Sequence, residues 1–256
     1  MNPEPPLFIS RLDPHIPPRV HRLRQLDVPH FTADDKREAT AVLAEALHGI
    51  LDTVFTHLLL DIEDSYGEPG GHTRALKSAH DTIGDVKYRI DHYLGWVIKF
   101  LSNKRLVPGI AHYETMVHEL PDAGLAFAGF SIPKELGERA RVELGEMKAG
   151  TRTDSSEGIE LLIEFLDVSS DPIVREPIEL MQFNKVVTKT LYGVLNFAEG
   201  LVRKELRKLP PVMPPELLPL LARHMETVLV FDESELQEKL ESAPEPGSVA
   251  ARQGPG

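Results

Sequence analysis

Residues 32–64 read TADDKREATAVLAEALHGILDTVFTHLLLDIED, and this stretch decides the fold class. Its apolar residues recur at spacings of three and four, which place them on one face of an α-helix. Thr32 with Asp34 and Asp35 is typical of a helix start, because the threonine oxygen accepts from backbone N–H groups and acidic side chains favour the positive end of the helix dipole. The apolar face is broad, so we expect this helix to contact at least two neighbours.

Two further stretches have the same period. The first covers residues 73–103 and follows a short glycine-rich link, so it is expected to pack against residues 32–64 as an antiparallel hairpin. The second covers residues 177–209 and contains Gly193 and Gly200. Each glycine costs a helix about 1 kcal/mol relative to alanine. We therefore expect close approach of another helix at these glycines as compensation.

The fold class follows from these three stretches. Shorter helical patterns lie between them, and no run of residues reads convincingly as a set of strands. The sequence predicts an all-α fold, a helical bundle built on three long helices at about 32–64, 73–103 and 177–209, with shorter helices, an extended N-terminal arm and a disordered C-terminal tail.

The ends of the chain differ from its middle in composition. Residues 1–31 contain seven prolines, which oppose a long helix, and are expected to form an extended proline-rich arm. Residues 32–231 are expected to form a single α-helical domain. Residues 232–256 are acidic and have too little apolar surface to offset ordering entropy, so we expect a mostly disordered tail. The arm carries three candidate partner-binding residues, which could equally lie on the protein's own acidic surface: Arg19, Arg22 and Arg24.

Charge and composition exclude several classes of ligand. The chain has 256 residues, a formal net charge of −12 and no cysteine. A net negative charge disfavours nucleic acid and anionic membranes, and the absence of cysteine removes disulfides and thiolate metal sites. The first residues lack the pattern of a secretory signal, and ionisable residues interrupt the most apolar stretch, 41–60. We expect a cytoplasmic, soluble protein that neither binds nucleic acid nor inserts into a membrane.

Histidines and carboxylates supply candidate metal ligands in three groups. The predicted hairpin brings His57 to the height of His80. An acidic cluster near the end of the first helix, with a following histidine, could hold Mg²⁺ or Ca²⁺. A third pair would share a helix face at a spacing of four. Neighbouring side chains could neutralise each group instead, and the candidates are His57, His80, Asp61, Asp64, His72, Glu114 and His118.

Three functions fit this sequence. No complete catalytic constellation or phosphate-binding loop is present. This favours a non-enzymatic α-helical interaction protein, an adaptor, regulator or assembly subunit, whose partner is another protein or a second copy of the chain, with no cofactor. The alternative is a metal-dependent helical-bundle enzyme, an oxygen-activating oxidoreductase or a metallophosphohydrolase, using Fe, Mn, Mg or Ca. The third is a small-molecule sensor that binds between helices, suggested by the apolar face around Phe55, Phe127 and Phe130.

Overall fold

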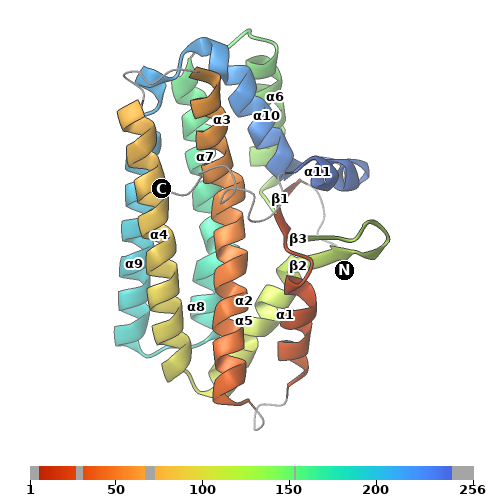
Figure 1. Ribbon diagram of the computed structural model, residues 1–256, viewed down its shortest axis with the longest axis vertical. Helices are drawn as coiled ribbons and strands as arrows, with labels where there is room; N and C mark the ends of the chain where they lie inside the picture. Colours follow the sequence, from red (N-terminus) through yellow and green to blue (C-terminus); the bar gives the residue numbers. More distant parts are fainter. Residues whose placement is uncertain (1–5, 27–30, 67–72, 153, 244–256) are drawn as a thin grey trace.

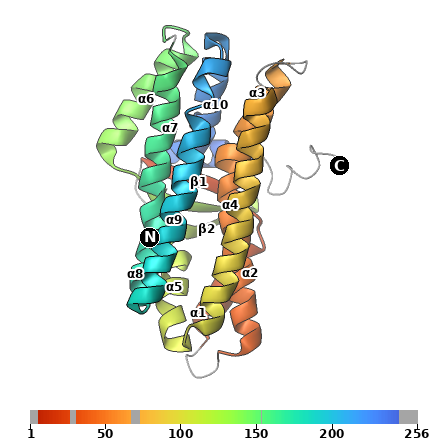
Figure 2. The same ribbon diagram turned by 90° about the vertical axis from the view of Figure 1, so that its left-hand side faces the viewer.

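The computed structural model describes residues 6–26, 31–66, 73–152 and 154–243. The fold is mostly α-helical and bundled, as the periodicity predicts (Figure 1). Four helical rods, counted over the described residues, run along the long axis of the molecule (Figure 2): α2–η2–α3 (Ala33–Leu51, Asp52–Thr56, His57–Tyr66), α4 (Thr73–Phe100), α7–η4–α8 (Ser155–Ser170, Asp171–Arg175, Glu176–Leu180) and α9 (Lys185–Leu206). The segments η2 and η4 are single π-helical turns within their rods.

Shorter elements surround these rods. One end of the bundle is completed by α6 and α10, and α5 lies beside the other end (Figure 1). The bounds are α1 (Ile16–Gln25), α5 (Asn103–Met116), α6 (Lys134–Lys148), α10 (Leu218–Val228), α11 (Leu236–Ser242), and the 3₁₀ turns η3 (Pro121–Ala123), η5 (Pro210–Val212), η6 (Pro215–Leu217) and η7 (Glu233–Glu235).

The predicted helix start and hairpin are both confirmed. Thr32 Oγ1 accepts from the backbone N–H of Asp35 at 3.2 Å, and Asp35 Oδ2 accepts from the N–H of Thr32 at 2.9 Å, which is a complete capping box. Rod α2–η2–α3 packs beside the antiparallel α4. The stripe residues Ala39 and Leu58 are fully buried there.

The predicted long helix at 177–209 is present as α9 over Lys185–Leu206, but its predicted start is wrong, because the chain turns at residues 181–184. Gln182 has a left-handed backbone with φ of 47°. Asn184 then begins α9 by accepting hydrogen bonds from two backbone N–H groups. The expected close approach at Gly193 and Gly200 is also wrong, since a Cβ at either position would meet none of the described atoms within 4 Å.

The fold also contains a small antiparallel sheet that the sequence reading missed. Among the described residues its strand order is β2-β3-β1-β4. The strands are β1 (Leu7–Leu12), β2 (Val117–Leu120), β3 (Leu125–Ser131) and β4 (Leu229–Val230). Phe8 pairs with Phe130 across β1 and β3, and their rings stack at 5.0 Å. The sheet packs against α1 and α2 and against α11, which lies beside it in Figure 1.

The prediction of an extended N-terminal arm is therefore wrong for residues 7–25. Strand β1 lies inside the sheet, and α1 follows it. Pro17 and Pro18 fall in the first turn of α1, where a missing N–H removes no helical hydrogen bond. At the other end, η7 and α11 order residues 233–242, and the predicted disorder after them falls on residues 244–256, outside those described.

Rod α2–η2–α3 is, within the described residues, long and apolar enough to cross a membrane by length and composition. Its most apolar window of 18 residues has a mean hydropathy of 1.3, and 56% of that window is buried in the fold. A helix in the centre of a bundle needs the same composition, because it contacts neighbours on several sides.

Phe8 tests whether the first strand is part of the core. Its side chain is 2% exposed, so Phe8→Ala is expected to lower the free energy of unfolding by about 3–5 kcal/mol, measured by urea denaturation. Val142→Ala, at a side chain that is 60% exposed, is the control and should change it by less than about 0.5 kcal/mol. A loss below about 1 kcal/mol for Phe8→Ala would show that β1 is an appended arm.

Candidate functional site

A cavity of about 250 Å³ lies between the four rods. Its walls come from α2 and η2, from α4, from α7–η4–α8 and from α9, with Phe8 of β1 and Tyr113 of α5 at one side. The lining is apolar or aromatic apart from Arg89, Ser169, Ser170 and Glu199. The cavity is therefore a hydrophobic space with a few polar groups in its wall.

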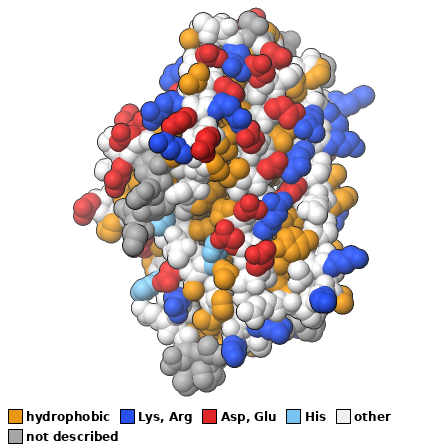
Figure 3. All heavy atoms as spheres, turned by 180° about the vertical axis from the view of Figure 1, so that it is seen from behind, with side chains coloured by type: hydrophobic (Ala, Val, Ile, Leu, Met, Phe, Trp, Pro, Cys, Tyr) orange, Lys and Arg blue, Asp and Glu red, His pale blue; other side chains and the backbone are white. Residues whose placement is uncertain are grey.

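Helix α9 packs loosely over this space. Leu191, Val194 and Ala198 line the cavity from α9 and are only half-buried. The α2 side chains Leu47 and Ile50, which also line it, are half-buried as well. Hydrophobic side chains emerge between charged ones over the middle of the molecule when it is viewed from behind (Figure 3). The side chains around the cavity are thus incompletely packed on α2 as well as on α9.

Both π-helical turns contribute residues to the cavity wall. Turn η2 supplies Val54 and Phe55, and η4 supplies Ile173 and Val174. Such turns are rare in helices and occur frequently at functional sites. Two of them facing one cavity make this space the leading functional candidate in the described part of the chain.

Side chains from neighbouring helices hold these turns in place. Tyr113 Oη donates to the carbonyl of Ile173 at 2.6 Å, and His112 Nε2 lies 2.6 Å from the carbonyl of Pro172. In η2, the carbonyl of Val54 accepts from His224 Nε2 at 3.0 Å. A carbonyl can only accept, so the proton of a neutral His224 must be on Nε2. Burial lowers the pKa of His224 below the ordinary histidine value.

The buried carboxylate in the wall is fully paired. The side chain of Glu199 is 7% exposed, and it accepts from Arg175 at 2.9 and 3.1 Å and from Arg203 at 3.4 Å. Arg203 also pairs with Asp167 of α7. These charge-assisted contacts compensate the burial of Glu199 and fasten α9 to the rod α7–η4–α8.

Arg89 is the other charged residue of the wall, and its surroundings differ. Its guanidinium carbon lies 4.9 Å over the ring of Phe197, so the contact joins α4 to α9. Its Nε is buried and has no hydrogen-bond partner. Within the described ranges, no carboxylate forms an ion pair with Arg89.

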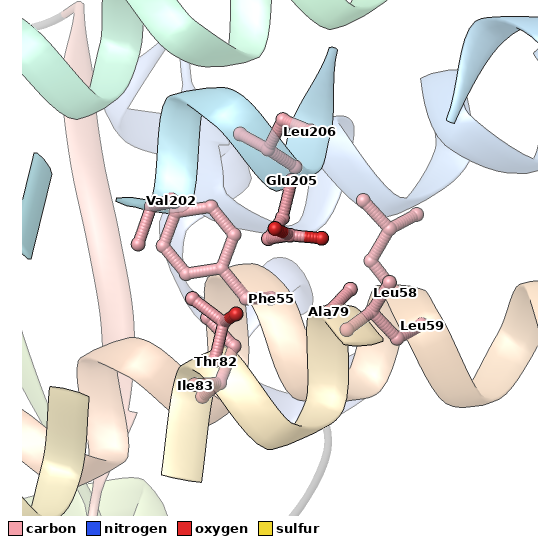
Figure 4. Close-up of a pocket in the computed structure, with 9 residues that line it drawn as sticks. All are labelled: Phe55, Leu58, Leu59, Ala79, Thr82, Ile83, Val202, Glu205 and Leu206. Carbon is pink, nitrogen blue, oxygen red and sulfur yellow. The ribbon is translucent and has the colours of Figure 1, made fainter. Parts of the chain in front are cut away.

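A second void near the cavity is too small to be a site. It measures about 10 Å³ and lies between α3, α4 and α9, beside Leu58, Ala79 and Glu205 (Figure 4). This volume matches a single water molecule. The Glu205 carboxylate at its edge already accepts from Ser78 at 2.8 Å and from Lys208 at 2.6 Å.

The described residues contain no group of three metal-ligating side chains. His57 is buried in the core, and His80 Nε2 lies 3.9 Å from a carboxylate oxygen of Glu63. Burial lowers the pKa of His80. Asp61 is half-buried and Asp64 is exposed at the end of α3. His72 falls outside the described residues.

The expected helical pairing of Glu114 with His118 is wrong. Helix α5 ends at Met116, so His118 lies on β2, where its ring packs on Phe127 at 5.0 Å. Glu114 faces α1 instead, with its carboxylate 2.9 Å from His21 Nδ1. The change from helix to strand between the two residues separates their side chains.

The three arginines of the N-terminal segment contact acidic residues of the same chain. Arg19 binds Glu38 at 2.7 Å, Arg22 lies 3.5 Å from Asp35, and Arg24 lies 3.5 Å from Glu114. These contacts attach α1 to α2 and α5. A role of these arginines in binding a partner stays a prediction.

These features define the protein as a mostly α-helical bundle with an apolar cavity between its rods. No protein-family model matches the chain, and neither does any curated protein or solved structure.

The sequence predicts three phenylalanines beside a ligand-binding gap between helices, and one of them lines the cavity. Phe55 lines the cavity, whereas Phe127 and Phe130 lie in β3. The available signal was Pro172, a proline within a helical pattern, because such a residue disrupts the helical ladder and here sits in η4.

The buried His224 predicts acid sensitivity. The pKa of His224 in the folded state lies below its unfolded value of about 6.5. Its contribution to the free energy of unfolding is therefore complete above about pH 6.5 and is lost as the pH falls toward the folded pKa. The free energy of unfolding should therefore be lower at about pH 5.5 than at about pH 7.5. His224→Gln keeps an N–H donor without titrating, so it should flatten this pH dependence, measured by urea denaturation at both pH values.

His80→Gln provides a graded comparison. The side chain of His80 is 20% exposed, so its replacement should flatten the pH dependence less than that of His224. If the free energy of unfolding of His224→Gln depends on pH as strongly as that of the wild type, the assignment of a neutral, buried His224 is contradicted.

Proposed function

We propose that this protein binds a small apolar molecule in the cavity between its four rods. The observation that carries the proposal is a space of about 250 Å³ with an almost wholly apolar lining in the middle of the bundle. Protein interiors are normally packed as densely as organic crystals, so a space of this size is unusual in a core.

The size and lining of the cavity suit an organic ligand better than water. A buried water needs two to four polar partners, and an apolar cavity of about 150 Å³ stays dry and binds benzene. The present cavity is larger, and most of its few polar groups already bond within the protein. Burial of apolar ligand surface would stabilise a complex by about 25 cal/mol per Å² before the costs of association.

The wall is also pre-formed. Each rod contributes side chains, and the π-turns that shape two walls are held by hydrogen bonds from His224 and Tyr113. Ligand sites in proteins are usually such preorganised, mostly apolar pockets between helices. This supports the sensor or carrier role over the other two functions.

The other expectations stay predictions. A helix-face partner, an oligomer and a cytoplasmic location are not tested by this geometry. The metal-dependent enzyme also stays a prediction; the described residues, which leave out His72, contain no group of three metal-ligating side chains.

Filling the cavity tests the proposed function. Ala198 lines it from α9, so Ala198→Trp should occupy the space and weaken binding of the neutral probe octan-1-ol at least about tenfold, a loss of about 1.4 kcal/mol. Isothermal titration calorimetry measures this loss, and the wild-type chain should bind with a negative heat-capacity change.

Asn196→Trp is the matched control, because Asn196 is exposed on the same helix and does not line the cavity. It should bind octan-1-ol like the wild type. The proposal is overturned if the wild type does not bind octan-1-ol, or if Ala198→Trp binds it equally well.

A further inference from the structure

We infer that the ligand of this cavity is amphipathic and carries a carboxylate, which Arg89 binds. The inference rests on the proposed function and specifies its ligand as the class of a medium-chain fatty acid. It follows from comparing the four polar residues in the cavity wall.

Three of these polar residues already have partners inside the protein. The Ser169 hydroxyl donates to the carbonyl of Phe165 at 2.6 Å, and that of Ser170 donates to the carbonyl of Leu166 at 3.0 Å. Glu199 is bound by two arginines. Arg89 is the exception, because no described carboxylate pairs with it and its buried Nε lacks a partner.

The contact with Phe197 leaves the donors of Arg89 available. A cation over an aromatic ring interacts with the ring face through its charge. A guanidinium has five N–H donors that lie in its own plane, and these match the two oxygens of a carboxylate. A buried N–H without an acceptor costs free energy, which a bound carboxylate would recover.

The charges around the cavity admit a single anionic group. Glu199 in the α9 wall is neutralised by Arg175 and Arg203, so it adds little repulsion. The net charge of −12 is spread over the whole chain, and salt screens exposed charges beyond about 8 Å. One guanidinium with one positive charge balances a carboxylate, whereas a phosphate monoester carries about two negative charges.

The rest of the lining requires an apolar body on the same ligand. Beyond Arg89, the α4 wall continues with side chains such as Ile90, Leu94 and Val97. A neutral hydrocarbon would leave Arg89 without an acceptor, and a small hydrophilic anion would leave the apolar lining unfilled. A chain with one terminal carboxylate satisfies both parts of the site.

The test compares octanoate with octan-1-ol, which share a chain length and differ in the head group. Both are titrated calorimetrically into the full chain at about pH 7.4, where octanoate is charged. The variants are Arg89→Gln and, as the control, Arg37→Gln, an exposed arginine of α2 that pairs with Asp34. The wild type should prefer octanoate. Arg89→Gln should weaken octanoate binding by about tenfold to a hundredfold and change octan-1-ol binding less than about twofold, since charge-assisted hydrogen bonds fall in this range.

The outcomes separate this inference from the proposed function. If the wild type binds neither probe, both are overturned. If it binds octan-1-ol and the Arg89→Gln variant binds octanoate like the wild type, only the carboxylate assignment is overturned. Arg89→Lys keeps the positive charge but loses the planar guanidinium donors that match two carboxylate oxygens. A selective partial loss of octanoate binding in this variant supports the inference even if Arg89→Gln fails to fold. Unchanged octanoate binding in Arg89→Lys overturns it.

Discussion

The cavity depends on a proline inside a helix. Pro172 has no N–H to donate to the preceding turn, and the rod α7–η4–α8 widens there into a π-turn. The carbonyls of Pro172 and Ile173 then accept from His112 and Tyr113 of α5. This single constraint orients the lower part of the rod, directs Ile173 and Val174 toward the interior, and fixes α5 beside it.

A second π-turn, η2, shapes another wall of the cavity and has a different cause. Turn η2 lies in the most apolar rod of the bundle and contains no proline, and His224 of α10 binds its Val54 carbonyl. Two widened turns, each held by an aromatic side chain from a neighbouring helix, keep the rods from closing on each other. The ion pairs of Glu199 hold the third side, and α4 with Arg89 forms the fourth.

The helical hairpin could be predicted because its local signals agree. Thr32 and Asp35 form the cap that their order suggests, and the stripe from Ala39 to Ile62 is buried as its period requires, apart from the half-buried Ile50. The break before α9 escaped prediction because apolar residues keep a helical spacing across residues 181–184. Its signal was Asn184, a good N-cap residue inside an apparently continuous pattern.

The sheet and the cavity were hidden for different physical reasons. Strands β1 and β3 are buried on both faces, so they lack the alternation by which an exposed strand is identified. The cavity is a deficit of packing, and residues that line a space have the same composition as residues that fill one. Arg89 could not be singled out either, because an arginine on a helix usually reaches solvent or an acidic neighbour.

The unequal fastening of α9 has a kinetic consequence. On the α7 side, the contacts of Glu199, Arg203 and Arg207 with charged partners form a row of ion pairs. On the α4 side, Ser78 donates a hydrogen bond to Glu205 at 2.8 Å, and Arg89 lies over the ring of Phe197, a type of contact worth about 0.5–1 kcal/mol at exposed sites. Charged pairs therefore hold α9 to α7, whereas its contacts with α4 are mostly uncharged. Because the α9 side chains that line the cavity are only half-buried, we expect a guest molecule to exchange through small displacements of α9 on the nanosecond-to-millisecond scale, while the remainder of the bundle stays folded.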